Sequence, residues 1–255
     1  MLMRLLYIAL FISLLLVTAA SVAQEFVTDG LVAFWTLDKS DIDGATVKDV
    51  SGNGNDAKII GKLNSVKGVI DECLEFDGEP NYVEIPPMGS WEQASVECWA
   101  LTLSFDGTPR GLVSTWQWVP GKVHFKFQSN QKITAHKNDG AEVGDKSNFE
   151  LNKWYHIIYT CDTEANELKL YVNGELVNQG ASGATPQNMD ERRIGSEHDG
   201  RFLMGMVDDV RIYNRVLNEK EVKQNFKVTS NVMAVSLKDK LATCWGHLKE
   251  ITLSQ

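Results

Sequence analysis

Three carboxylates stand at alternate positions in residues 75–79, which read E-F-D-G-E. On an extended strand, side chains at alternate positions point to the same face. Two carboxylates about 5–5.5 Å apart can act as nucleophile and general acid in glycoside hydrolysis. Gly78 and Pro80, however, weaken a central strand and favour a turn. We therefore predict no catalytic role for Glu75 or Glu79 and keep glycoside hydrolysis as the minor alternative.

Asp208 is the second candidate for a functional role. It lies within residues 205–217, which read G-M-V-D-D-V-R-I-Y-N-R-V-L. If this stretch is a strand, Asp208 shares a face with Val210 and Ile212. A buried, isolated carboxylate is costly, so it must meet a backbone donor, an arginine or a metal. Calcium prefers oxygen ligands, including carboxylates and backbone carbonyls. An ordinary hydrogen-bonded carboxylate and a calcium ligand are the two open interpretations.

Trp116 and Trp118 alternate onto one side near the end of a predicted hairpin. An exposed indole offers a flat apolar face with a polar N–H, which suits a stacked sugar ring. His198 and Arg201, in a loop just before the strand that contains Asp208, can supply polar contacts. We predict that these four residues bind a ligand. The alternative is that one tryptophan is core, the other covers the hairpin, and the His198 loop is solvated.

Patterns of other enzyme and metal sites are missing from the sequence. It has no Gly-x-Ser-x-Gly elbow, phosphate-binding glycine loop or His-Glu-x-x-His motif. No Cys-x-x-Cys or His-x-x-x-His pair indicates zinc. His156 lies in an apolar run and is expected to be a structural residue. The sequence thus favours a protein that is not an enzyme.

Residues 1–23 have the pattern of a secretion signal. A basic residue, Arg4, precedes an apolar run, and Ser-Val-Ala at 21–23 gives a small-x-Ala cleavage pattern. The run is short for a transmembrane span, so an uncleaved anchor is the alternative. We predict a secreted, periplasmic or cell-surface protein without an integral membrane span after cleavage. Its formal net charge of −9 disfavours nucleic acid as a partner, because phosphates attract basic surfaces.

The four cysteines are too few for a scaffold built on disulfides. Three of them lie in apolar, strand-like runs. We predict buried free thiols. The four are Cys73, Cys98, Cys161 and Cys244.

The middle of the chain alternates short apolar runs with turn residues and has no long helical stretch. Asn173-Gly174 is the best hairpin signal, because a type I′ turn needs positive φ at both positions. Residues 49–56 predict a tight loop, with an oxygen-rich cation site as the alternative. The pattern predicts an all-β, antiparallel, two-sheet jelly-roll sandwich. Strands are expected at 31–37, 73–76, 82–85, 96–103, 111–116, 122–127, 154–161, 167–172 and 206–213.

A short helix is predicted over residues 217–226, where Asn218 and Glu221 can form a capping box. Residues 228–255 are expected to form a linker and an amphipathic helical tail. The apolar stripe of that tail consists of Leu237, Leu241, Trp245 and Leu248.

Five stretches together resemble the laminin G-like jelly-roll domains of secreted bacterial proteins, within the concanavalin A-like lectin and glucanase superfamily. They cover about residues 29–226, so we place one domain at 24–227. The resemblance implies a jelly roll and specifies function only weakly, because one fold hosts many activities. The stretches are 29–37 (D-G-L-V-A-F-W-T-L), 49–56 (D-V-S-G-N-G-N-D), 74–85 (L-E-F-D-G-E-P-N-Y-V-E-I), 154–174 (W-Y-H…L-Y-V-N-G) and 205–217.

The same resemblance implies a function and a metal site. Related sandwiches hold a structural calcium ion, which here would bind the Asp208 carboxylate, the Gly78 carbonyl and an oxygen near Asp29. Laminarinase-type hydrolases of the superfamily carry a Glu-x-Asp-x-Glu strand motif, from which residues 75–79 depart. The expected function is therefore non-catalytic recognition of a glycan or polysaccharide. A module that binds a cell-surface or extracellular matrix protein, for adhesion or surface structure, is the alternative.

Overall fold

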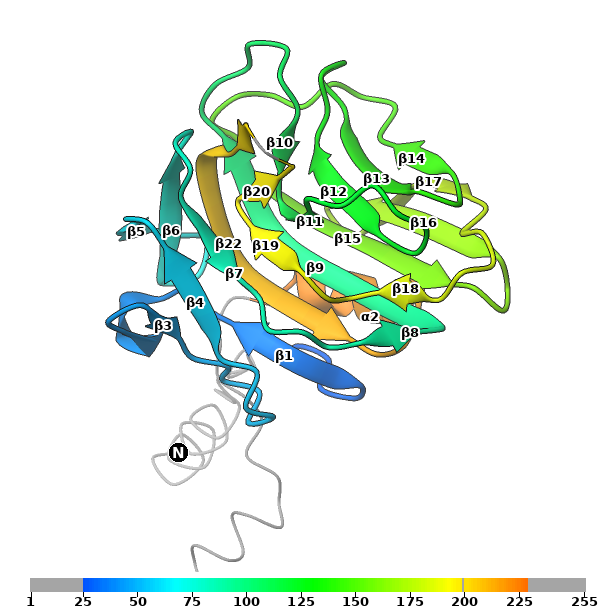
Figure 1. Ribbon diagram of the computed structural model, residues 1–255, viewed down its shortest axis with the longest axis horizontal. Coiled ribbons are helices and arrows are strands. Elements are labelled where there is room, and N and C mark those ends of the chain that lie inside the picture. Colours follow the sequence, from blue (N-terminus) through cyan, green and yellow to red (C-terminus); the bar gives the residue numbers. More distant parts are fainter. Residues whose placement is uncertain (1–24, 199, 229–255) are drawn as a thin grey trace, which may run out of the picture.

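The computed structural model describes residues 25–198 and 200–228, which form a sandwich of two β layers (Figure 1). The predicted signal and residues 229–255 of the predicted tail, with Cys244, lie outside the described residues. One layer is an eight-stranded antiparallel sheet, called here the back sheet. Its strands, in order across the sheet, are β17 (Glu175–Gly180), β16 (Glu167–Val172), β15 (Tyr155–Asp162), β9 (Gln93–Thr102), β22 (Met204–Tyr213), β6 (Glu72–Asp77) and β5 (Asn64–Lys67), with β1 (Leu31–Trp35) paired to β22.

The other layer, the front layer, consists of two sheets that meet between β11 and β12, where Leu112 N donates to Phe125 O. The first is β2 (Ile42–Asp43), β3 (Thr46–Val47), β4 (Ala57–Ile60), β7 (Tyr82–Glu84), β19 (Arg192–Ile194), β11 (Val113–Thr115), β20 (Ser196–Glu197) and β21 (Arg201–Phe202). The second is β10 (Arg110–Gly111), β12 (Val123–Phe127), β13 (Ile133–Lys137) and β14 (Glu142–Gly144). The remaining elements are the 3-10 turn η1 (Lys39–Asp41), the pair β8 (Ser90–Trp91) and β18 (Gln187–Asn188), and the helix α2 (Glu219–Phe226).

Alternation along the front strands separates core from outer face. On β12, Val123, Phe125 and Phe127 are buried in the core between the layers. His124 and Lys126 therefore point away from the core, to the outer face of the front layer. The predicted jelly-roll sandwich is confirmed. Its one parallel pairing recorded among the described strands joins β11 to β20.

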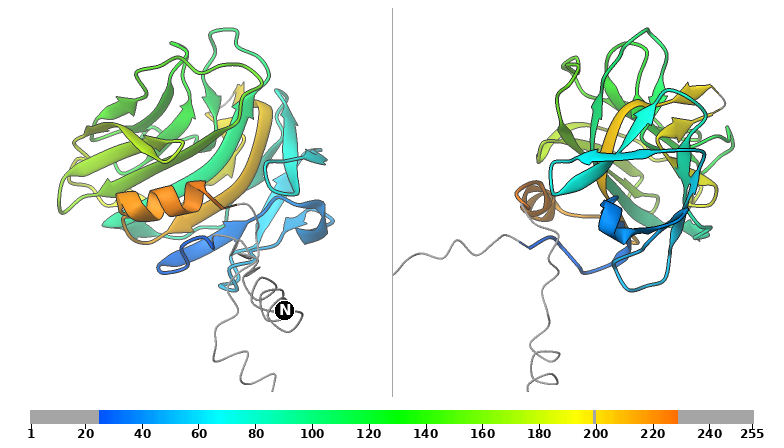
Figure 2. Two further views of the ribbon diagram at one scale, coloured as in Figure 1. Left: turned by 180° about the vertical axis from the view of Figure 1, so that it is seen from behind. Right: turned by 90° about the vertical axis from the view of Figure 1, so that its left-hand side faces the viewer.

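The hairpin and helix predictions are also confirmed. Asn173 and Gly174 have φ values of 51° and 82°, so both take the positive φ of a type I′ turn between β16 and β17. Asn218 caps α2, and its side chain forms a reciprocal capping box with Glu221. The helix lies against the outer face of the back sheet (Figure 2).

The described cysteines, Cys73, Cys98 and Cys161, are free and buried, as predicted. Burial raises the pKa of the Cys73 thiol to about 12 and that of Cys161 to about 11, so both stay protonated and unreactive. Within residues 25–198 and 200–228, no helix is long and apolar enough to cross a membrane.

The closing strand β22 lies beside the opening strand β1, with Trp35 opposite Val210. The predicted alternation along β22 is wrong at Asp208. The register against β9 shifts between Asp208 and Arg211, and Asp209 has a φ of 51°. This β-bulge inserts one residue, so Val210 faces the core while Asp208 lies on the opposite face.

The Asp208 carboxylate meets backbone donors. Its Oδ2 accepts hydrogen bonds from Val69 N (2.8 Å) and Ile70 N (3.1 Å), and the residue is fully buried. Burial and the neighbouring Asp209 carboxylate raise the pKa of Asp208 to about 8. A hydrogen-bonded carboxyl group, which keeps its proton at neutral pH, is thus the interpretation that the contacts support.

Glu97 is the centre of a buried polar network between the back sheet and α2. Its Oε1 lies 2.8 Å from His156 Nε2 and 3.1 Å from Arg211 Nη1. Its Oε2 accepts a hydrogen bond of 2.6 Å from Asn225 Nδ2 on α2. Asn225 Oδ1 in turn accepts a hydrogen bond from Val27 N. The network joins three strands, the helix and the N-terminal segment, and gives His156 its predicted structural role.

We predict that Glu97→Gln lowers the free energy of unfolding by about 3–5 kcal/mol, because Arg211 and His156 lose the buried charge that compensates them. Urea denaturation measures this. The matched control is Glu167→Gln, which breaks a 2.6 Å surface pair with Lys169 and should cost less than about 1 kcal/mol. Equal losses in the two variants would contradict a structural role for the network.

The raised pKa of Asp208 predicts that stability falls as pH rises. Between its ordinary value of 3.8 and about 8, the folded state keeps a proton that the unfolded state has released. The contribution is therefore complete below about pH 4 and is lost as pH rises through about 8, at up to about 1.4 kcal/mol per pH unit. Asp208→Asn should flatten this part of the profile. Parallel profiles for the variant and the wild type would show that Asp208 does not titrate in this window.

Candidate functional site

Trp116 and Trp118 lie in the loop between β11 and β12, but they face different neighbours. Trp116 lies near Arg193, with the guanidinium carbon 5.9 Å from its ring centroid. Trp118 stacks on His124, with ring centroids 3.9 Å apart and an interplanar angle of 21°. The two rings therefore belong to two neighbouring sites on the front layer. A single platform built from both does not form.

The first site, called here the Trp118 cluster, comprises Trp118, His124, Lys126, Glu197 and Arg201. Glu197 Oε1 lies 2.9 Å from His124 Nδ1, 3.1 Å from Lys126 Nζ and 3.3 Å from Arg201 Nη1. The Lys126 ammonium lies 5.5 Å from the Trp118 ring centroid. Trp118 is 47% exposed, whereas Glu197 and His124 are fully buried. The cluster thus has a charged floor and an exposed aromatic edge.

The charges of the cluster stabilise one another. Burial alone would raise the pKa of Glu197, but the contact with His124 and the charge of Lys126 hold it below the ordinary value. Burial lowers the pKa of His124 and favours its neutral form. The second oxygen, Glu197 Oε2, is buried and has no hydrogen-bond partner within the described part of the chain.

Two further histidines border Trp118. The His198 ring lies 6.3 Å from the Trp118 ring, and the His136 ring lies 5.8 Å from it. Three of the four predicted ligand-binding residues, Trp118, His198 and Arg201, are thus brought together, and Trp116 lies in the other site. His124, Lys126 and Glu197 were not predicted as site residues. The alternation His-Phe-Lys on β12, with only phenylalanine in the core, was the signal for the first two.

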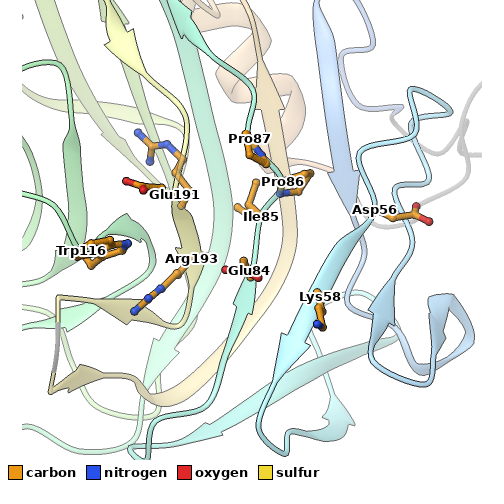
Figure 3. Close-up of a pocket in the computed structure, with 10 residues that line it drawn as sticks. Asp56, Lys58, Glu84, Ile85, Pro86, Pro87, Trp116, Glu191 and Arg193 are labelled. Carbon is orange, nitrogen blue, oxygen red and sulfur yellow. The ribbon is translucent and has the colours of Figure 1, made fainter.

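The second site is a groove of about 440 Å³ on the same layer, called here the Trp116 groove (Figure 3). It runs over β4, β7 and β19. Trp116 lies beside Arg193 at one side, and Glu84 and Lys58 follow across the groove (Figure 3). Residues that line the groove include Lys58, Glu84, Pro86, Pro87, Trp116 and Arg193.

The carboxylates of residues 75–79 do not form a row on one strand. Strand β6 ends at Asp77, and Gly78 follows with a φ of 84°. Glu79 N donates to Asp77 Oδ1, which closes a turn. Glu75 and Glu79 are therefore on different elements, and the geometry of a carboxylate pair on one strand face is not formed.

The three predicted calcium ligands are not assembled. Gly78 N bonds to Leu203 O before the start of β22, and Asp29 Oδ2 lies 3.0 Å from Arg215 Nε beyond its end. At about 3.3 Å per residue, the ten residues of β22 span roughly 30 Å, whereas one ion reaches ligands at about 2.3–2.6 Å. Asp208, Gly78 and Asp29 therefore do not fit a common ion, and the predicted ligand set is wrong. Within the described ranges, no group of three or more His, Cys, Asp or Glu side chains is placed to hold a metal.

In the loop 49–56, the alternative cation site, the carboxylate oxygens of Asp49 already accept hydrogen bonds from the backbone. Asp49 Oδ1 accepts from Phe34 N and Ser51 N, and Oδ2 accepts from Asn55 N. Asn53 Nδ2 donates to Leu31 O. Asp49 therefore organises the turn, and both of its oxygens bond backbone donors.

Solved structures share this fold at low sequence identity. Domain 4 of AbnA, a GH43 extracellular arabinanase from Geobacillus stearothermophilus in complex with arabinotriose, matches with a TM-score of 0.59 and 17% identity, over 76% of this chain and 97% of that chain. Trypanosoma rangeli sialidase in complex with sialic acid matches with a TM-score of 0.64 and 19% identity, over 84% of this chain but only 37% of the sialidase. The binding domain of Paraclostridial Mosquitocidal Protein 1 matches with a TM-score of 0.55 and 17% identity, over 78% of this chain and 52% of that chain.

No curated protein matches the chain significantly in sequence. The laminin G type 3 profile, described as the concanavalin A-like lectin/glucanases superfamily, matches residues 77–223, more than half of the 255 residues. The match includes the Trp118 cluster, the Trp116 ring and the closing strand. Together with the jelly-roll sandwich, it shows that the chain belongs to the concanavalin A-like lectin/glucanase superfamily.

Proposed function

We propose that the protein is a non-catalytic glycan-recognition module and that the Trp118 cluster binds the sugar. The observation that carries this proposal is the half-exposed Trp118 ring, held by His124 next to the Glu197 charge network. One face of the indole packs on the imidazole, which fixes the ring and leaves apolar surface for a sugar ring.

The polar groups around Trp118 suit hydroxyl groups, which both donate and accept hydrogen bonds. Arg201 and His136 are partly exposed and can donate, and the Glu142 carboxylate, 3.8 Å from His136, can accept. The charges around Trp118 balance, since the two cations, Lys126 and Arg201, are matched by the two carboxylates, Glu197 and Glu142. A neutral sugar fits such a balanced set, because it brings no charge that must lose its hydration.

The structural neighbours support a glycan as the ligand. The arabinanase domain was solved with arabinotriose, and the sialidase with sialic acid. The mosquitocidal protein supplies a binding domain of the same fold. Arabinotriose is therefore the first probe for this chain.

We also propose that the protein is exported through the predicted signal. N-terminal sequencing of the exported protein should begin at Gln24. An intact N-terminus on the exported chain would contradict cleavage.

We predict that the purified domain binds oligosaccharides on an array that includes arabinotriose, and that Trp118→Ala weakens this binding by about tenfold or more. A tenfold loss corresponds to about 1.4 kcal/mol, a magnitude that loss of one stacked ring can supply. Stability should fall by less than about 2 kcal/mol, against about 3–5 kcal/mol for a large core truncation.

The matched control for Trp118→Ala is Val119→Ala, at the next residue, which is 45% exposed. It should bind glycans as the wild type does. A large loss of stability with unchanged glycan affinity would mean that Trp118 is a packing residue. Binding to extracellular proteins with no glycan binding would favour the adhesion alternative.

We further propose that the chain does not hydrolyse glycosides. The separation of Glu75 on β6 from Glu79 in the following turn supports this. We predict no release of reducing sugar from β-glucans, and unchanged glycan binding in Glu75→Gln and Glu79→Gln. Glucanase turnover that Glu75→Gln abolishes would overturn the proposal.

Calcium binding stays a prediction, now without its proposed ligand set. An ion that binds the folded state alone raises the melting temperature as its concentration increases. We predict a higher melting temperature in millimolar calcium than in chelator. Identical melting in calcium and in chelator would contradict calcium binding.

A further inference from the structure

We propose that the Trp116 groove is a second binding site, which takes a sugar unit bearing a carboxylate, a uronate. In this site the sugar ring packs on Trp116 and its carboxylate pairs with Arg193. The site does not depend on the Trp118 cluster, and the two can be tested separately.

The groove presents a row of alternating charges across three strands. In the register of the sheet, Glu84 on β7 lies directly opposite Lys58 on β4 and directly opposite Arg193 on β19. Side chains at such positions have Cβ atoms about 4.5–5.5 Å apart on one face of the sheet. Val83 and Ile194 face the core, so Glu84 and Arg193 point outward into the groove. The row therefore reads cation, anion, cation.

Other carboxylates of the groove are already compensated. Asp56 Oδ2 lies 3.1 Å from Lys48 Nζ, and its Oδ1 accepts a hydrogen bond from Asp49 N. Glu191 Oε2 lies 3.6 Å from the buried Lys122 Nζ. What remains is the row itself, with two cations and one carboxylate, and the fully buried Arg192, whose Nη1 donates to Val113 O. The groove thus has a local excess of positive charge, and one ligand carboxylate can balance the unmatched cation of the row.

Arg193 is held in place by rings rather than by carboxylates. Its guanidinium carbon lies 4.2 Å from the Tyr82 ring centroid and 5.9 Å from the Trp116 ring centroid. Within the described chain, no hydrogen bond or ion pair of this guanidinium is recorded. A guanidinium stacked on aromatic rings keeps its N–H donors free in the ring plane, where they can bind a carboxylate with two parallel hydrogen bonds.

The walls of the groove favour a sugar as the carrier of that carboxylate. The Trp116 ring is 38% exposed and gives a flat face at the end of the charged row. Pro86 and Pro87 add apolar surface, and the volume of about 440 Å³ is in the range of small-molecule sites. A saccharide chain that lies across the strands, from Trp116 toward Lys58, would follow the row.

The test uses trigalacturonate and its carboxyl-reduced, neutral counterpart, titrated calorimetrically into the purified protein at physiological ionic strength. The acidic trisaccharide should bind at least about tenfold more tightly than the neutral one. Arg193→Gln should remove this preference, and Arg193→Lys should restore only part of it, because lysine lacks the planar fork. Glu84→Gln should increase affinity for the acidic ligand, since it removes the competing carboxylate.

Two controls separate the site from general charge and from the Trp118 cluster. Lys223→Gln changes the net charge as Arg193→Gln does, but it lies on α2 against the back sheet, so it should leave both affinities unchanged. Trp118→Ala should keep the preference for trigalacturonate. Equal affinity for the two trisaccharides, no binding of trigalacturonate by the wild type, or a lower affinity in Glu84→Gln would overturn the proposal.

Discussion

The structure depends on a carboxylate that is buried away from the apolar core. Glu97 is fully buried, and its two oxygens contact His156, Arg211 and Asn225. An unpaired charge in this place would be far too costly, so these groups must come together when the chain folds. They bring β9, β15 and β22 into register and fix α2 on the back sheet. Arg211 also pairs with Asp209, the residue at the bulge of β22, so the same network sets the point at which the closing strand changes face.

The front layer contains a second buried carboxylate with basic partners, but a different element covers it. Glu197, like Glu97, is fully buried and contacts a histidine and basic side chains. Glu97 is sealed by a helix whose cap, apolar face and Asn225 all fix its position. Glu197 contacts His124 and Lys126, which both lie against Trp118, a half-exposed ring on a loop. Loops that a rigid scaffold positions are where proteins commonly place binding residues. The back network therefore serves the fold, whereas the front cluster has the exposure that recognition needs.

The sequence predicted what depends on local pattern. Strand alternation, the Asn173-Gly174 turn and the Asn218 capping box are properties of a few neighbouring residues, and the structure confirms them. The predicted face of Asp208 was wrong. The alternation of apolar and polar residues does not reveal a β-bulge whose extra residue is an aspartate rather than a glycine. Glu197 and Arg193 were missed as site residues, because their partners come from distant strands. Gly78 and Asp29 were taken as calcium ligands from family resemblance, and Asp208 from the resemblance and its predicted strand face. The distances along β22 exclude the three as one set.

The two tryptophans show how closely the two proposed sites are linked. Trp116 and Trp118 are two residues apart, so their Cα atoms are at most about 7 Å apart, yet their rings serve different neighbours. A ligand unit on one ring is then close to a unit on the other. A polysaccharide that carries both neutral and acidic units can engage the two sites with one chain. Such a ligand gains from a high effective concentration at the second site once the first is filled. Overall repulsion by a net charge of −9 is screened beyond about 8–10 Å, so the local charges of the groove decide the affinity for its acidic unit.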